Sequence, residues 1–214
     1  MPAAATPANL SRWSASTWLL LRHDRGGAAL APGGTLGGSQ AGLRVHYRLD
    51  RALALSARLS LPLRETRAAE AAAGLDWRPF AGLPVHLLAE RRQALGRGGR
   101  SAFVLTLYGG HSGRIGRRLA LEAYGQAGLV GLRSRDPFVD GAGRISAPLG
   151  RFEVGAGAWA AAQPGASRLD VGPHVALRLP GLGGNMRLIA DWRIRVAGDA
   201  APGSGPAFTL ASDF

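Results

Sequence analysis

The feature that most constrains this chain is an alternation of apolar and polar side chains with a period of two residues. Segment 40–49 shows it without a break. Its polar face carries Gln40, Gly42, Arg44, His46 and Arg48, and its apolar face carries Ala41, Leu43, Val45, Tyr47 and Leu49. Successive side chains of a β-strand point to opposite faces, and about ten tilted residues cross a bilayer. The segment therefore predicts a strand that separates two different environments.

The same alternation recurs along the chain, whereas helical spacing is interrupted by Gly or Pro in nearly every long window. We expect further strands in segments 53–61, 69–78, 85–90, 119–127, 139–145, 152–158, 168–178 and 186–196. Segments 12–22 and 101–109 alternate less cleanly, because apolar residues also occupy their second face, and segment 207–214 ends the chain. The pattern predicts about twelve strands joined by connectors rich in Gly and Pro.

The apolar faces are expected to meet lipid. Leu, Val, Ala and Trp occupy these faces through nearly every segment, while the opposite faces mix Arg with acidic and small residues, as a crowded lumen does. Hydrocarbon cannot satisfy backbone N–H and C=O groups, so strands cross it only as a closed sheet. The chain also ends in an aromatic residue, Phe214, after apolar residues at alternate positions, as the last strand of bacterial outer-membrane barrels does.

We therefore predict an all-β fold, an antiparallel up-and-down transmembrane β-barrel of about twelve strands in the bacterial outer membrane. Residues 12–214 form the barrel and residues 1–11 an N-terminal extension. Because soluble sheets also alternate, a soluble anion-binding β-barrel is an alternative. Residues 1–10 lack the basic and apolar regions of a signal peptide, so we expect either a removed leader or a part of a longer protein.

The charge of the chain is concentrated in arginine. All 26 basic residues are Arg, and against 14 acidic residues they give a net charge of +12. The arginines expected to face the lumen and to bind anions are Arg44, Arg48, Arg58, Arg144, Arg168, Arg178, Arg187, Arg193 and Arg195. A guanidinium group stays charged and binds carboxylate or phosphate in a fork, so these residues suit an anionic polymer. Alternatively, they pair with acidic residues and fill a narrow barrel.

A second group of arginines lies in the predicted connectors. Its members are Arg25, Arg64, Arg67, Arg97, Arg100, Arg133 and Arg135. At the extracellular rim they would meet either phosphate groups of surface glycolipid or solvent. Nucleic acid is not an expected partner, because the arginines are spread among apolar faces without a patch of stacking aromatics.

No cofactor, metal or catalytic site is expected. The chain has no Cys, and no Ser lies in a recognisable nucleophile motif. His46, His86 and His174 fall on lumen faces, where we expect hydrogen-bonding roles, so the chain is predicted not to be an enzyme. An outer-membrane lipid-modifying hydrolase is an alternative. The aromatics Trp13, Trp18, Trp77, Trp159, Trp192, Tyr47 and Phe214 are expected to form a sparse interfacial girdle.

Several segments resemble one family. WLLLRHDRGG, GGSQAGLRVHYRLD, LDWRPF, PVHLLAERRQALGRGGRSAF and the closing aromatic are similar to the C-terminal region of phage-adsorption (NfrA-type) outer-membrane proteins. The likeness begins at about Trp13. Those proteins carry helical repeats before a barrel and are related in organisation to exopolysaccharide-export porins. The resemblance implies a channel, or a docking or export barrel, for anionic polysaccharide or a phage-receptor assembly. It also implies two partners, the lipid of the outer membrane around the barrel and a helical-repeat protein in the periplasm.

Overall fold

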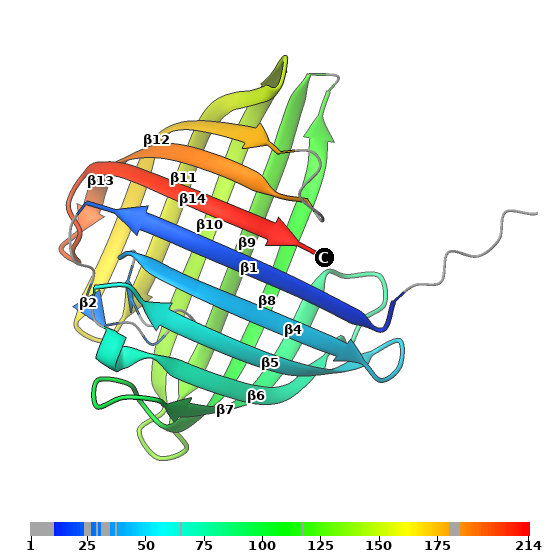
Figure 1. Cartoon of the computed structure of the whole chain (residues 1–214), viewed down its shortest axis with the longest axis vertical. Helices are drawn as coiled ribbons and strands as arrows, with labels where there is room; N and C mark the ends of the chain where they lie inside the picture. Colours follow the sequence, from blue (N-terminus) through cyan, green and yellow to red (C-terminus); the bar gives the residue numbers. More distant parts are fainter. Residues whose placement is uncertain are drawn as a thin grey trace, which may run out of the picture.

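Twelve antiparallel strands close into one barrel (Figure 1). The computed structural model describes residues 11–214 apart from 24–26, 29, 31–34, 37, 65, 117 and 180–184. The barrel strands are β1 (Trp13–Arg22), β4 (Gln40–Arg48), β5 (Leu53–Pro62), β6 (Glu70–Trp77), β7 (Val85–Ala94), β8 (Ala102–Ile115), β9 (Leu119–Val130), β10 (Asp136–Leu149), β11 (Phe152–Gln163), β12 (Ala166–Arg178), β13 (Arg187–Gly198) and β14 (Gly205–Asp213). The predicted up-and-down barrel of about twelve strands is confirmed.

The barrel closes where the first and last strands pair. Leu19 of β1 lies opposite Leu210 of β14, and the backbones of Ala15 and Phe214 exchange hydrogen bonds of 3.1 and 2.8 Å. Closure gives the backbone N–H and C=O groups at both edges of each barrel strand hydrogen-bonding partners, which hydrocarbon could not supply. The predicted extension lies almost wholly outside the described residues, since residues 1–10 are not described.

The even number of strands places both ends of the barrel sequence at one mouth, which we call the termini end. The opposite mouth, the loop end, carries connections 23–39, 63–69, 95–101, 131–135, 164–165 and 199–204. The longest, 23–39, contains the ribbon of β2 (Gly27–Ala28) and β3 (Thr35–Leu36), and 63–69 contains the 3-10 helix η1 (Thr66–Ala68). Because outer-membrane barrels carry their longer connections outside, we assign the loop end to the extracellular side. Among the described residues, no helix has the length and apolar character needed to cross a membrane.

The two faces of the barrel wall differ as the alternation predicts. On β5, Leu55 and Leu59 point outward and are 46% and 47% exposed, whereas Arg58 between them points inward and is 3% exposed. Outward-facing apolar residues continue around the barrel at Leu43, Leu75, Leu105, Val139, Ile145, Val154, Ile194 and Phe208. A closed sheet with an apolar exterior and a charged interior belongs in hydrocarbon, so the alternative of a soluble barrel is wrong.

Two aromatics of the predicted girdle face the lumen instead. Trp18 lies on β1 between inward-facing Ser16 and Leu20, and Trp159 on β11 is 6% exposed. Trp159 shares its face with Glu153, so the alternation of β11 itself turns the ring inward. The girdle interpretation is therefore wrong for Trp18 and Trp159.

Strand β8 is apolar on both faces because its inner face packs against the longest connection. The inward-facing Ala102 and Val104 form a buried cluster with Val130 and Phe138, and Leu30 of connection 23–39 packs on that cluster. This second apolar face obscured the alternation in the sequence. Connection 23–39 thus contributes side chains to the inside of the barrel at the loop end.

Candidate functional site

A cavity of about 710 Å³ occupies the lumen between the two mouths. It is lined by four of the predicted arginines, Arg44, Arg144, Arg168 and Arg193, and by aromatic rings from separate strands. Those rings belong to Trp18, Tyr108, Tyr124 and Trp159. Gly42 makes room for one of them, because a Cβ at position 42 would overlap the Trp18 ring. The cavity therefore combines guanidinium groups with flat apolar surfaces.

One carboxylate between two guanidinium groups is a repeated unit of the lumen. Glu90 lies 3.6 Å from Arg44 and 3.5 Å from Arg58, with Arg58 and Glu90 fully buried. A single carboxylate neutralises only one of two arginines, so this group retains one positive charge.

The unit recurs near the loop end, where Asp170 sits between Arg22 and Arg168. The Arg22 Nη1 and Arg168 Nη2 atoms lie 3.4 and 2.6 Å from Asp170 Oδ2. All three side chains are at most 3% exposed. Arg168 also donates to the backbone carbonyl of Leu36 at 3.4 Å, which ties this group to connection 23–39.

A third copy of the unit lies toward the termini end. Arg187 Nη1 and Arg144 Nη1 lie 2.7 and 3.8 Å from the carboxylate oxygens of Glu122. These side chains are 20–33% exposed, in contrast to the buried group around Asp170. Glu122 belongs to β9 and Arg187 to β13, so the contact bridges strands that are not neighbours in the wall.

A buried pair on β12 and β13 supports the Trp159 face of the cavity. His174 Nδ1 lies 2.6 Å from Asp191 Oδ1, and Arg193 Nη2 lies 3.4 Å from Asp191 Oδ2. The Arg193 guanidinium lies 4.5 Å from the centroid of the Trp159 ring, within range of a cation–π interaction. His174 therefore has the hydrogen-bonding role expected of it.

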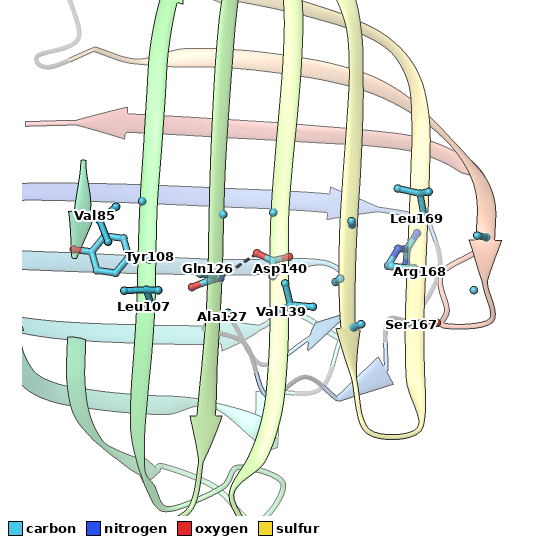
Figure 2. A pocket seen from close by; sticks show the side chains of 18 residues that line it. Val85, Leu107, Tyr108, Gln126, Ala127, Val139, Asp140, Ser167, Arg168 and Leu169 are labelled. Atoms are coloured by element: carbon cyan, nitrogen blue, oxygen red, sulfur yellow. Dashed lines mark hydrogen bonds between the residues drawn. The ribbon is translucent and has the colours of Figure 1, made fainter. Parts of the chain in front are cut away.

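The wall formed by β8 to β12 carries further polar groups on its inner side (Figure 2). Asp140 accepts hydrogen bonds from Gln126 at 3.0 Å and from the Tyr124 hydroxyl at 3.1 Å. A second hollow of about 610 Å³ lies against the same strands, and outward-facing side chains such as Leu107, Val139 and Leu169 line it. It therefore belongs largely to the outer side of the wall and adds no charge to the lumen.

At the termini end, a smaller pocket of about 210 Å³ surrounds a carboxylate shared by several residues. Asp76 lies 3.3 Å from His46 Nε2 and 2.8 Å from His86 Nδ1, and it accepts a hydrogen bond from Tyr108. The His86 and Tyr108 rings stack with centroids 4.9 Å apart. His86 therefore serves as a hydrogen-bonding partner inside the barrel, whereas His46 Nε2 approaches the Asp76 carboxylate without hydrogen-bond geometry.

The structure distributes the nine predicted lumen arginines over three depths. Arg44, Arg144, Arg168 and Arg193 line the large cavity, and Arg58 is buried behind it. Arg48 lines the pocket at the termini end, Arg187 contacts Glu122, and Arg178 pairs with Glu153 while 71% exposed. Arg195 donates to the carbonyls of Asp199 and Ala200 at the loop end. Sequence reasoning thus grouped residues that the fold separates into several sites.

Arg22 and Arg92 were missed as lumen residues. Arg92 is 2% exposed and donates to the Leu30 carbonyl at 2.5 Å, which places it under connection 23–39. Its parity with His86 and Glu90 on β7 was the available signal. Of the connector arginines, Arg64, Arg67, Arg97, Arg100, Arg133 and Arg135 lie in loop-end connections. Arg25 lies outside the described residues.

Among the described residues, no three His, Asp or Glu side chains are placed so that they could hold a metal ion together. Ser14 lies opposite His46 across β1 and β4, where His46 directs Nε2 toward Asp76. The hydrogen bonds found among the described side chains join no Ser hydroxyl to a His ring. The absence of enzymatic activity stays a prediction, as does the hydrolase alternative.

Comparison with known proteins gives structural likeness without a family. No protein-family model and no curated protein matches the chain. Among solved structures, it is similar to an outer-membrane channel from Pseudomonas putida F1, with 13% identity, a TM-score of 0.44, and 100% of this chain and 98% of that chain covered. It is also similar to KdgM porin, with 9% identity, a TM-score of 0.45 and coverage of 94% and 98%. A bacterial polysaccharide outer-membrane secretin gives 10% identity, a TM-score of 0.41 and coverage of 96% and 100%.

The assignment to a membrane rests on the barrel's own surface, which is closed, apolar outside and charged inside. Barrels of this kind span bacterial outer membranes. The chain is an outer-membrane β-barrel. The barrel therefore has a membrane-embedded wall around a charged lumen, and the chemistry of that lumen is what any solute would meet.

Proposed function

We propose that this barrel is an anion-selective channel that admits short anionic oligosaccharides. The observation that carries the proposal is the repeated unit of one carboxylate between two guanidinium groups, found around Glu90, Asp170 and Glu122. Each unit holds excess positive charge in a wall of low dielectric, where it attracts anions and repels cations.

The guanidinium groups at the cavity also keep donors for a ligand. Arg44 and Arg144 line the cavity, and their side chains are 15% and 20% exposed, so a solute in the cavity can reach them. A carboxylate or sulfate group on a solute is a suitable acceptor for their N–H donors. The lumen is thus better matched to anions than a lumen with fully paired arginines would be.

The aromatic rings of the cavity indicate that its solutes are acidic sugars, because small inorganic anions have no apolar face to pack against a ring. Trp18, Tyr124 and Trp159 present apolar surface to the cavity, against which the C–H face of a sugar ring can pack. A volume of about 710 Å³ accommodates a short oligosaccharide. Uronic acid units, which combine such a face with a carboxylate, fit both features.

The test is conductance of the refolded protein in planar bilayers, with block by uronic acid oligosaccharides compared with neutral oligosaccharides of equal length. We expect anion preference and selective block by the uronic acids. The double variant Arg44→Gln, Arg144→Gln should lower the anion preference roughly two- to fivefold, because each partly exposed charge contributes about 1 kcal/mol or less.

Arg151→Gln is the matched control, since Arg151 is exposed in the turn 150–151 at the termini end. It removes the same charge without touching the cavity, so selectivity should stay at the wild-type value. Equal anion and cation permeability in the wild type, or equal block by neutral and acidic sugars, would contradict the proposal.

Two more specific roles, polysaccharide export and docking of a phage or a partner protein, extend this proposal. In the export role, an anionic polysaccharide would pass through the lumen, and its acidic groups would move between the arginine units. In the docking role, implied by the resemblance to phage-adsorption proteins, the loop end would bind a phage or the termini end a helical-repeat partner. Both roles stay predictions. Retention of a labelled acidic polysaccharide by cells expressing the cavity variants tests export.

A further inference from the structure

The outward face of the barrel carries one charged residue that the lumen does not explain. Arg91 on β7 is exposed and shares its face with Leu87 and Ala89, whereas Arg92, the next residue, points inward and is 2% exposed. Among the described strand residues, every other Arg, Asp and Glu occupies an inward-facing position or a strand end at a mouth. Arg91 is therefore the one charged residue that points to lipid from within a described strand.

Arg91 lies at the loop end of the wall, near the membrane–water interface. Its cross-strand partners are Ala73, near the start of β6, and Phe103, the second residue of β8. A lipid-facing Arg costs about 2–4 kcal/mol at the bilayer midplane and only about 0–1 kcal/mol near the interface. Its position is thus compatible with contact to lipid headgroups.

The surroundings of Arg91 combine a ring with further cations. The Arg91 guanidinium lies 4.9 Å from the centroid of the Phe103 ring, which orients it against the outer wall. Connection 131–135 joins this corner, because Gly131 N–H donates to the Phe103 carbonyl at 2.8 Å. That connection presents Leu132, 72% exposed, and the exposed Arg133 and Arg135.

The charge of this corner is not balanced by the described residues nearby. Asp136, the first residue of β10 directly after connection 131–135, pairs with Arg100 at 2.6 Å. Arg91, Arg133 and Arg135 have no ion pair within the described chain. Arginine forks and an exposed apolar side chain beside a lipid surface match a phosphorylated lipid, whose phosphate the forks bind and whose acyl chains lie on the wall.

We propose that Arg91, with Arg133 and Arg135, forms a binding site for the phosphate group of an outer-leaflet glycolipid of the lipid A type. The Phe103 ring and Leu132 contact its acyl chains. The site lies outside the lumen and is independent of conduction. Glycolipid binding and channel selectivity therefore fail or succeed separately.

The test is binding of diphosphorylated lipid A to the folded barrel in detergent, compared with dephosphorylated lipid A and with phosphatidylglycerol. We expect the diphosphorylated form to bind most tightly, and Arg91→Gln to weaken it about tenfold, because a charge-assisted hydrogen bond is lost. Arg91→Lys keeps the charge but loses the fork, so its affinity should lie between the two. Arg151→Gln, at the other end, should bind like the wild type.

Heat-dependent mobility in gels confirms that each variant is folded before binding is measured. Equal affinity of the wild type for the phosphorylated and dephosphorylated glycolipid would overturn the proposal. Wild-type affinity in Arg91→Gln would overturn it as well. Full displacement of lipid A by millimolar inorganic phosphate would identify a free-phosphate site instead of a lipid site. Equal affinity for phosphatidylglycerol and lipid A would show that the site is not specific for a glycolipid, and would overturn the proposal in that respect.

Discussion

The groups around Asp170 and Glu122 are built from the same kinds of side chain but differ in how deeply they are buried. Each places one carboxylate between two arginines. The Asp170 group, near the loop end, is at most 3% exposed, whereas the Glu122 group, toward the termini end, is 20–33% exposed. The difference shows that burial, and not the choice of residues, decides what an arginine in this lumen can do.

The buried group is part of the fold, and the exposed group is available to solutes. Arg22 and Arg168 also bind backbone carbonyls of Gly203 and Leu36, so their donors connect strands to loop-end connections. Arg144 lines the cavity, and its side chain is 20% exposed. Under the proposed function, pairing and anion binding, which stood as alternatives, are assigned to different parts of one lumen.

The largest expected effect is on stability at Asp170. Asp170→Asn leaves two buried guanidinium groups without a counter-charge, and removing one partner of a buried ion pair costs about 3–5 kcal/mol. The free energy of unfolding, measured with urea in lipid vesicles, should fall by about this amount. A loss below about 1 kcal/mol would show that the loop-end group does not hold the fold together.

The matched change at the exposed group should act on selectivity. Glu122→Gln releases Arg144 and Arg187 from their carboxylate, so the anion preference in bilayers should rise roughly two- to fivefold, while stability changes by about 1 kcal/mol or less. High salt should reduce the gain, since the screening length falls from about 10 Å at 0.1 M to about 3 Å at 1 M. A large loss of stability without a change in selectivity would place this group with the buried one.

The ring beside Arg193 should have a smaller effect. Trp159→Leu keeps an apolar side chain but removes the ring that lies 4.5 Å from the guanidinium. Cation–π contacts contribute about 0.5–2 kcal/mol. We expect affinity for uronic acid oligosaccharides, measured from channel block, to fall about threefold, in line with roughly 0.7 kcal/mol. Unchanged block would exclude Trp159 from the sugar site.

The smallest effect is expected at the rim of the termini end. Glu153 pairs with Arg178, whose side chain is 71% exposed, and such pairs contribute about 0–1 kcal/mol. Glu153→Gln should therefore leave the urea midpoint close to that of the wild type. A loss comparable to that of Asp170→Asn would remove the distinction between buried and exposed pairs.

Alternation within a strand could be predicted from the sequence, because it depends on neighbouring residues alone. Segment 40–49 was predicted as a strand and β4 covers Gln40–Arg48, with Arg44 facing the lumen as its parity requires. Contacts across the lumen could not be predicted, because they join distant residues. Arg22 meets Asp170 only once the barrel has closed, and Leu30 packs on the cluster that contains Val104 only through the path of connection 23–39.

Trp159 shows where residue type led to a wrong prediction. Tryptophan is common at membrane interfaces, which favoured a girdle, whereas in β11 Trp159 lies on the face of Glu153. The structure follows parity, because neighbouring side chains on a strand must point to opposite faces. Arg91 and Arg92 illustrate the same rule, since adjacent arginines lie on opposite sides of the wall.

The reversal potential of the wild-type barrel in a planar bilayer with a potassium chloride gradient tests the central claim most directly. Excess guanidinium around the cavity predicts a reversal potential whose sign indicates preference for chloride over potassium. Its magnitude should decrease as the salt concentration rises on both sides, because salt screens the arginine charges. A sealed bilayer with inserted, folded protein and no current, or a potential on the potassium side, would contradict the account of an anion-selective lumen.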